Sequence, residues 1–317
     1  MHHSLSAIYS CALYVLFAGT SAQAKVVPQI DGLWWHVASN PDLGQYTTSK
    51  QQPVDFALWQ AADGTWQLCS CIRITNCGGY GRLLYHWEGK NITDLNWKPQ
   101  GIALTAKPEL GETLGGLQAP NVFKSGKTYF MAYGDWENIC LAQSKDGKSF
   151  ERIIQPSGKT GIFTEGRGTN TRDPMIIRTG DKWLCYYTAF LGPEANSHAY
   201  VFARTSSDLK KWSDSVIVAY GGSAGNDKWS CECPHVVEYA PGIYYLFRTQ
   251  RYGRDAQTSV YCSTNPYNFG IDDDSYLVCK LPVAAPEIII CNGEYYLAAL
   301  EPDYSGIRIA RLKWVQQ

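Results

Sequence analysis

The sequence predicts an all-β protein that folds as a single five-bladed β-propeller, and three observations lead to this prediction. One pattern, an apolar stretch, a Gly-containing turn and an aromatic strand, recurs five times along the chain. The copies follow one another at intervals of about 50 to 65 residues, close to the length of one four-stranded blade. The 317 residues include 21 tyrosines, 11 tryptophans and 29 glycines, which is typical of twisted sheets joined by many turns.

Each copy predicts the inner hairpin of one blade, and a second pattern predicts the outer strands. This second pattern is a strand, a Ser/Asp turn and a closing aromatic residue, and it is clearest at residues 139–150 and 200–212. A β-sandwich of five unrelated hairpins is the alternative, but a sandwich gives no reason for the register to recur. The five copies cover residues 55–71, 120–133, 173–187, 234–247 and 286–298.

The first 24 residues predict a secretion signal peptide. An apolar run over residues 7–18 is followed by Ser-Ala-Gln-Ala at residues 21–24, a small-x-small cleavage site. The leader contains no Lys or Arg, so a short membrane anchor is kept as the alternative, although the run is short for a membrane span. The expected mature domain is residues 25–317, secreted or periplasmic.

Cysteine usage agrees with export. Removing Cys11 with the leader leaves an even number of cysteines, which predicts several disulfide bonds of undetermined connectivity. Cys185 is expected to be a buried free thiol, because the other copies have Leu or Met at its position. The pairs at residues 69/71 and 231/233 also suggest a four-sulfur zinc site, but their spacing is one residue shorter than the usual Cys-x2-Cys.

Charge limits the class of partner. The formal net charge is −1, and this balance argues against a nucleic acid or an anionic membrane as partner. We therefore expect a neutral or weakly charged ligand and a monomer or small homo-oligomer. No cofactor or catalytic metal is expected, and a structural calcium ion is left open.

Three carboxylates stand at corresponding points of the first, third and fourth copies. Asp55 and Asp173 immediately precede the residue that opens the apolar strand, and Glu232 lies two residues before Pro234. Because the first strand of each blade lines the central channel, these acids are expected to converge near the axis. Two carboxylates that flank a glycosidic bond suffice for its hydrolysis, and a third acid nearby can help to hold a proton.

The motifs around these acids resemble those of the five-bladed propeller glycoside hydrolases, the superfamily of families 43, 62, 32 and 68. Arg-Asp-Pro at 172–174 and Glu-Cys-Pro at 232–234 are similar to the paired signatures of family 32, and Gln-Ala-Pro at 118–120 resembles the second-blade motif of family 43. The resemblance implies a glycosidase acting on a furanoside such as an arabinofuranoside or fructofuranoside.

The same resemblance implies roles for the acids. Glu232 would be the proton donor, Asp173 would stabilise the transition state and tune the donor, and Asp55 would be the nucleophile or the general base. Retention and inversion of configuration both stay open. A catalytically silent glycan-binding propeller is the alternative function, because a fold alone does not establish chemistry.

Other residues are candidates for substrate binding or for the catalytic set. Each of these residue types also has a structural explanation. An Arg beside an acid can form an ion pair that only stabilises the fold, and a His in a strand can simply be hydrogen bonded. Aromatic residues belong more often to the core than to a binding site. Asp31 is a rival to Asp55, Glu287 is a fourth acid, and the role of His36 is left undecided. The predicted substrate contacts are Arg172, Gln118, Trp34, Trp35, Trp136, Trp229 and His235.

Overall fold

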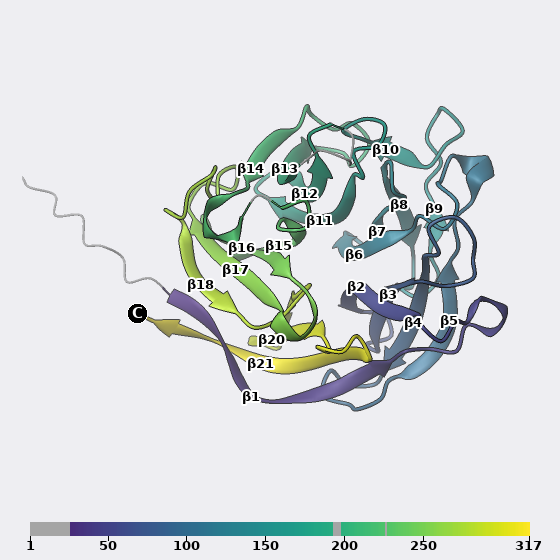
Figure 1. Cartoon of the computed structure of the whole chain (residues 1–317), viewed down its shortest axis with the longest axis horizontal. Helices are drawn as coiled ribbons and strands as arrows, with labels where there is room; N and C mark the ends of the chain where they lie inside the picture. Colours follow the sequence, from purple (N-terminus) through teal and green to yellow (C-terminus); the bar gives the residue numbers. More distant parts are fainter. Residues whose placement is uncertain (1–25, 193–197, 226) are drawn as a thin grey trace, which may run out of the picture.

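The computed structural model of the chain describes residues 26–192, 198–225 and 227–317, and it confirms the five-bladed β-propeller (Figure 1). Each blade is a twisted antiparallel sheet whose first strand lies nearest the axis. The innermost strands β2, β6, β11, β15 and β19 contact one another in turn around the axis, and β19 returns to β2. The ring is therefore closed by side-by-side packing of five sheets.

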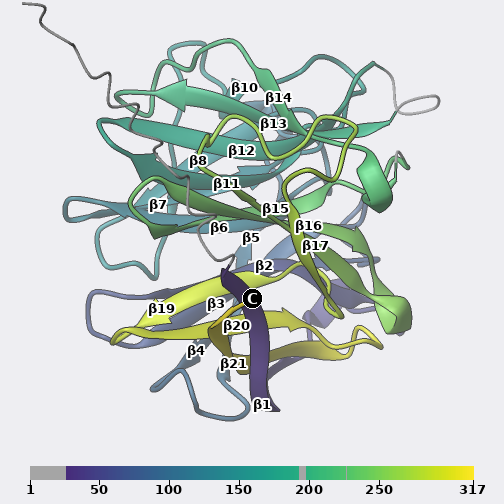
Figure 2. The same ribbon diagram turned by 90° about the vertical axis from the view of Figure 1, so that its left-hand side faces the viewer.

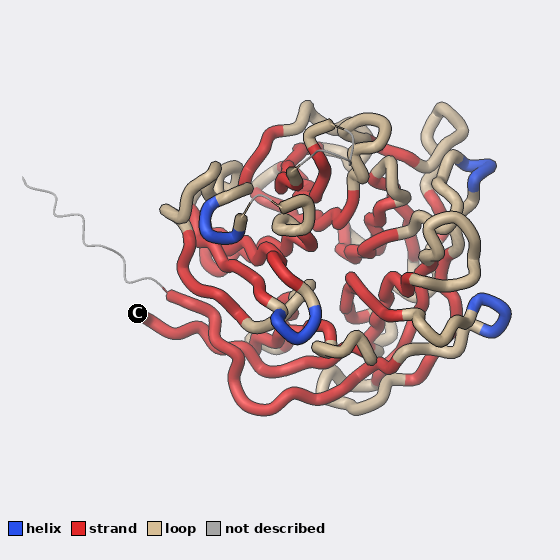
Figure 3. Tube along the Cα trace, viewed as in Figure 1, coloured by secondary structure: helices blue, strands red, loops and turns tan. Residues whose placement is uncertain are grey.

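The strands follow the predicted order, in which the chain runs outward through one blade before it enters the next. The exception is the fifth blade, whose outermost strand comes from the N-terminus. Regular structure outside the strands is limited to short 3-10 turns among the described residues (Figure 3). Blade one contains β2 (Gln52–Gln60), β3 (Trp66–Arg73), β4 (Leu83–Gly89) and β5 (Lys98–Leu104), and blade two contains β6 (Gln118–Ser125), β7 (Thr128–Gly134), β8 (Ile139–Ser144), β9 (Glu151–Arg152) and β10 (Gly161–Phe163). Blade three contains β11 (Arg172–Thr179), β12 (Lys182–Phe190), β13 (Ala199–Ser206) and β14 (Val216–Ala219), and blade four contains β15 (Glu232–Ala240), β16 (Ile243–Arg251), β17 (Gln257–Ser263) and β18 (Leu277–Leu281). Blade five contains β19 (Glu287–Cys291), β20 (Glu294–Leu300), β21 (Gly306–Gln316) and β1 (Val26–Ser39). The 3-10 turns are η1 (Gly44–Tyr46), η2 (Pro108–Leu110), η4 (Gly222–Ala224) and η5 (Gly253–Asp255).

One backbone feature recurs at the inner end of every blade. The residue just before the apolar run has a positive φ, between 33° and 55°, although none of the five is glycine. The ladder register of β2, β6, β11 and β15 shifts at this point, which identifies a β-bulge that bends the strand and redirects its side chain. The five residues are Asp55, Ala119, Asp173, Cys233 and Ala285.

The fifth blade is completed by the N-terminal strand, which the repeat did not predict. Strand β1 pairs antiparallel with β21 from Val26 opposite Gln316 to Ser39 opposite Gly306. The two strands run side by side along the rim, and the C-terminus lies against the start of β1 (Figure 2). Pairing of two segments that are far apart in sequence closes the propeller and ties its ends together.

The cysteines do not form the expected disulfides, because every cysteine among the described residues is a free thiol. The buried ones are Cys69 and Cys71 on β3, Cys140 on β8, Cys185 on β12 and Cys231 just before β15. Burial of the Cys185 thiol agrees with expectation. The four-sulfur zinc site does not form among the described residues either, where the ligand cluster found consists of two aspartates and one cysteine.

Two further expectations concern membranes and export. Among the described residues, no helix is long and apolar enough to cross a membrane. The expected signal peptide, residues 1–24, lies outside the described part of the chain.

Closure by β1 can be tested with two substitutions in the same strand. Val37 is fully buried in the core between blades, whereas Leu33 is 89% exposed. Val37→Asp would bury an unpaired carboxylate and should lower the free energy of unfolding by more than about 4 kcal/mol. Leu33→Asp should change it by less than about 0.5 kcal/mol. Urea unfolding measures both values, and equal stabilities would contradict closure by this strand.

Candidate active site

A cavity of about 780 Å³ opens at the end of the axis where the innermost strands of blades one to four begin. Asp55, Asp173 and Glu232 all line it, so the structure brings the three predicted acids to one place. Four predicted contact residues also line this cavity: Arg172, Gln118, Trp136 and Trp229.

The bulges explain how acids from three blades reach the axis. Asp55 and Asp173 occupy the left-handed position of their strands, and Cys233 occupies it in the fourth blade. Glu232 lies one residue earlier in its strand, so its longer side chain enters the wide cavity. A left-handed non-glycine residue costs roughly 1–2 kcal/mol, and the surrounding sheets must hold this conformation.

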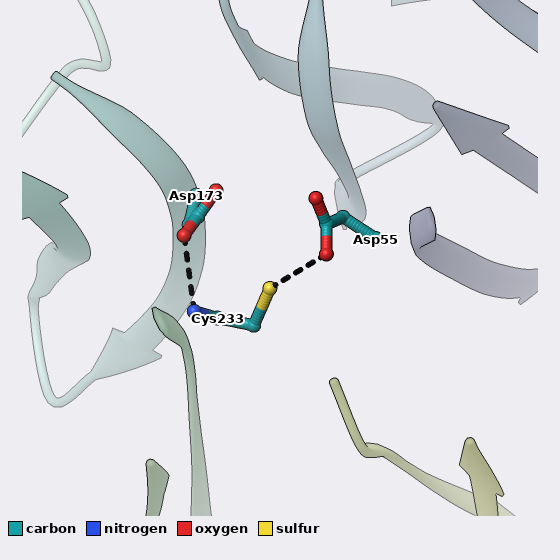
Figure 4. A group of neighbouring side chains, drawn as sticks. All are labelled: Asp55, Asp173 and Cys233. Atoms are coloured by element: carbon teal, nitrogen blue, oxygen red, sulfur yellow. Dashed lines mark hydrogen bonds between the residues drawn. The ribbon is translucent and has the colours of Figure 1, made fainter. Parts of the chain in front are cut away.

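Cys233 connects the two aspartates (Figure 4). Its backbone N–H donates to Asp173 Oδ2 at 3.0 Å, and its thiol donates to Asp55 Oδ1 at 3.2 Å. One residue of blade four therefore fixes acids that belong to blades one and three.

Tyr252 adds a second donor to the same oxygen of Asp55. Its hydroxyl lies 3.1 Å from Asp55 Oδ1 and 3.3 Å from Cys233 Sγ. No described residue donates to Asp55 Oδ2, so one carboxylate oxygen is held while the other stays available for reaction. Tyr252 follows β16 and lines the cavity. Tyr252 belongs to no recognisable motif, and nothing in a chain so rich in tyrosine distinguishes it from the other tyrosines.

Arg172 forms the electrostatic centre of the site. Its Nε donates to Glu232 Oε1 at 3.0 Å and lies 3.7 Å from Asp173 Oδ2, while Nη2 also contacts the Glu232 carboxylate. Its Nη1 donates to the carbonyl of Asn170 at 3.0 Å. The guanidinium is buried against the ring of Phe190, and such a charge is tolerated only when it is paired and hydrogen bonded.

The enclosed position shifts two acids toward their protonated forms. Burial raises the pKa of Asp173 to about 8, with a further rise from the charges of Glu232 and Asp55 that Arg172 partly offsets. Burial also raises the pKa of Glu232, and Arg172 opposes this shift. Because like charges in a confined site cannot all be ionised, the site can hold a proton at a pH where a free carboxylate has lost it.

The cluster of Asp55, Asp173 and Cys233 also offers three ligand atoms within 4.8 Å of one another. The thiol is a hydrogen-bond donor here, and burial raises the pKa of Cys233 well above its ordinary value. Metal-bound cysteine is a thiolate, and calcium takes oxygen ligands, so this set does not fit a calcium site.

Three predicted contacts lie elsewhere. His235 is in β15 and does not line the cavity, and its Nε2 accepts from the N–H of Ile288 at 3.2 Å. Trp34 and Trp35 lie on the outermost strand β1, where Trp34 packs under Arg308 and Trp35 donates to the carbonyl of Ile92. Repeated aromatic residues look alike in core and site, so the sequence did not separate them.

The alternative residues also lie outside the main cavity. Asp31 and His36 lie on β1. Asp31 forms an ion pair with Lys313 at 3.0 Å, and His36 is hydrogen bonded to Ser39. Glu287 lines a narrow channel of about 20 Å³, and its carboxylate lies 3.4 Å from the His235 ring.

Protonation of Asp173 predicts a pH-dependent stability. The folded chain retains this proton up to about pH 8, whereas the unfolded chain loses it near 3.8, so stability falls as pH rises through this window. Asp173→Asn should leave stability almost unchanged at pH 4 and raise it increasingly toward pH 8, by up to about 5 kcal/mol.

Denaturant unfolding at several pH values measures this effect. Asp208→Asn is the matched control, because hydrogen bonds from the N–H groups of Lys211 and Lys210 lower the pKa of Asp208. That substitution should give no gain at pH 8. A pH-independent effect of Asp173→Asn would contradict the buried proton.

Comparisons with known proteins agree with this architecture. No family model and no curated protein matches the sequence. Among solved structures, a thermostable family-43 glycoside hydrolase matches with a TM-score of 0.62 and 18% identity over 88% of this chain and 92% of that one. The RS223 β-xylosidase matches with a TM-score of 0.60 and 14% identity over 84% of this chain and 94% of that one. A Bombyx mori family-32 β-fructofuranosidase matches with a TM-score of 0.60 and 18% identity over 89% of this chain and 62% of that one. The chain thus has the five-bladed fold of glycoside hydrolase families 43 and 32, which confirms the expected resemblance at the level of fold.

Proposed function

We propose that the chain is a glycoside hydrolase that uses Asp55, Asp173 and Glu232 as its catalytic carboxylates. One observation carries the proposal: acids from three blades line one cavity and are linked through Cys233 and Arg172. The fold is that of proteins named as glycoside hydrolases, which supports the reaction class.

The contacts of each acid support a separate role. Glu232 is the proton donor, because burial raises its pKa and keeps it protonated at a pH where an exposed Glu is ionised. Asp55 is the nucleophile or the general base, because its Oδ1 is held by two donors while Oδ2 is unengaged among the described residues. Asp173 orients the sugar and, through its own raised pKa, limits the total negative charge of the site.

The substrate that we propose is a furanoside. A cavity of about 780 Å³ suits one or two sugar units, and the exposed Trp229 at its wall supplies an apolar face for stacking. Similar structures are named as a β-xylosidase/α-arabinofuranosidase in complex with xylotriose and a mutant β-fructofuranosidase in complex with sucrose. Export is part of the proposal and rests on residues 1–24.

The assignment of the donor is tested by Glu232→Gln. On the glycoside that the wild type hydrolyses best in a panel of aryl furanosides and pyranosides, kcat should fall by about 10² to 10⁴. Folding should be retained, because the amide oxygen can still accept from Arg172. Glu287→Gln, which alters a carboxylate outside the main cavity, should keep near wild-type kcat. Wild-type activity of Glu232→Gln would refute the assignment, and binding without hydrolysis by the wild type would favour a glycan-binding propeller.

Tyr252→Phe tests the support of Asp55. The change removes one of two hydrogen bonds to Asp55 Oδ1 and leaves the ring in place. A hydrogen bond to a charged group corresponds to about a tenfold effect or more, so kcat should fall by at least that factor with little change in KM. Tyr267→Phe, on an exposed side chain, should leave both constants unchanged. A change confined to KM would show that Tyr252 contacts the substrate instead.

A further inference from the structure

Two arginines lie at the same end of one hairpin in the cavity wall. Arg73 is the last residue of β3, and Arg82 directly precedes β4. Ile72 pairs with Leu83, so Arg73 and Arg82 are the next residues outward on the two sides of the hairpin. Both line the cavity, and their guanidinium groups lie over different rings, those of Tyr304 and Trp136. Two cations that line one cavity attract an anion.

Neither guanidinium meets a carboxylate within the described part of the chain. Arg73 donates from Nε and Nη2 to Gln52 Oε1, at 2.9 and 2.7 Å, and lies over the ring of Tyr304. Arg82 has one weak contact, from Nη1 to Cys71 Sγ at 3.8 Å. Its Nε and Nη2 have no partner among the described residues, and neither is sealed in the protein interior.

Three other enclosed arginines have acceptors within the protein itself. Arg152 and Arg204 each contact a carboxylate, at 2.7 and 2.6 Å. Arg248 has no carboxylate partner, but it donates to the carbonyls of Ser230 and Gly221, both at 2.9 Å. Arg82 has neither kind of acceptor, so its free N–H groups are available to a ligand.

The face of the Arg82 guanidinium is already covered. It lies 5.3 Å from the ring centre of Trp136, and Trp136 is itself stacked on Tyr80 with ring centres 3.8 Å apart. Stacking fixes the plane of the guanidinium and leaves its N–H edge for binding. Such a planar fork matches the oxygens of a carboxylate, sulfate or phosphate group.

We propose that Arg73 and Arg82 bind an anionic substituent, a carboxylate, sulfate or phosphate, of the sugar that the cavity accepts. This inference rests on the proposed glycosidase function and specifies its substrate class. The competing explanation is that Arg82 only balances the negative charges of Asp55 and Glu232. In that case, loss of Arg82 should impair neutral and charged substrates equally. If Arg82 binds an anionic substituent, its loss should impair mainly the charged substrate.

The experiment compares matched substrates. Wild type, Arg82→Gln and Arg73→Gln are assayed on one neutral aryl glycoside and on the same glycoside carrying a carboxylate, a sulfate or a phosphate. Wild type should prefer one of the charged forms, and the preferred form identifies the anion. Arg82→Gln should lower kcat/KM on that form by about 10- to 100-fold and change the neutral substrate little. Equal losses on both substrates, or a wild-type preference for the neutral one, would overturn the proposal.

Arg178→Gln is the matched control. Arg178 is exposed at the end of β11 and stacks over Trp183 at 5.5 Å, much as Arg82 stacks over Trp136, but it lies outside the cavity. Its substitution should leave the charge preference unchanged. Thermal unfolding of each variant verifies that folding is retained.

Direct binding separates this inference from the proposed function. Inorganic sulfate, inorganic phosphate and glucuronate are titrated calorimetrically into wild type, Glu232→Gln and Arg82→Gln. Wild type and Glu232→Gln should bind at least one of these anions about tenfold or more tightly than Arg82→Gln. Hydrolysis of neutral glycosides without any anion binding would overturn this inference alone. Anion binding without hydrolysis of any glycoside would overturn the proposed function alone.

Discussion

The left-handed residue at the start of each innermost strand is the constraint on which the site depends. The five residues with this conformation, Asp55, Ala119, Asp173, Cys233 and Ala285, all line the narrow channel of about 20 Å³ beneath the cavity. Glycine would remove the strain of roughly 1–2 kcal/mol at each position, yet none of them is glycine. The bulge turns each side chain toward the axis, where only small side chains fit. The longer Glu232 is therefore tolerated one residue earlier, at the floor of the wide cavity.

This crowding also determines the electrostatics of the site. Arg172 makes its direct contacts with Glu232, and it lies 3.7 Å from Asp173. The one hydrogen bond to the Asp173 carboxylate within the described residues comes from the backbone of Cys233. Asp173 is thus the least compensated of the paired acids, and burial raises its pKa the most clearly. The site holds a proton near neutral pH because three acids lie close together and Arg172 pairs directly with Glu232, not with Asp173.

The repeat predicted most of the fold and the positions of the acids, because the bulge recurs in register with it. Asp55 could be selected without a proline motif, since it occupies the position that Asp173 occupies in the third copy. The sequence could not predict that β1 closes the fifth blade, because its partner strand lies almost a full chain length away. The sequence also did not predict the contacts made from loops. Tyr252 contacts Asp55 from blade four, and Arg82 lines the cavity from the end of a glycine-rich loop. The disulfide prediction failed because an even number of cysteines says nothing of the blades that hold them.

Loops, and not the innermost strands, form the cavity wall beside the acids. Trp136 has a φ of 81°, which is strained for a tryptophan, and it sits in a turn where Asp135 Oδ1 accepts the N–H groups of Glu137 and Asn138 at 3.0 and 2.6 Å. Tyr80, from the loop of blade one, stacks on the Trp136 ring. Two loops from neighbouring blades therefore hold each other and fix the guanidinium of Arg82. Since the acids are set by the strands and this wall by the loops, the group that the wall recognises can differ between related chains while the position of the carboxylates stays the same.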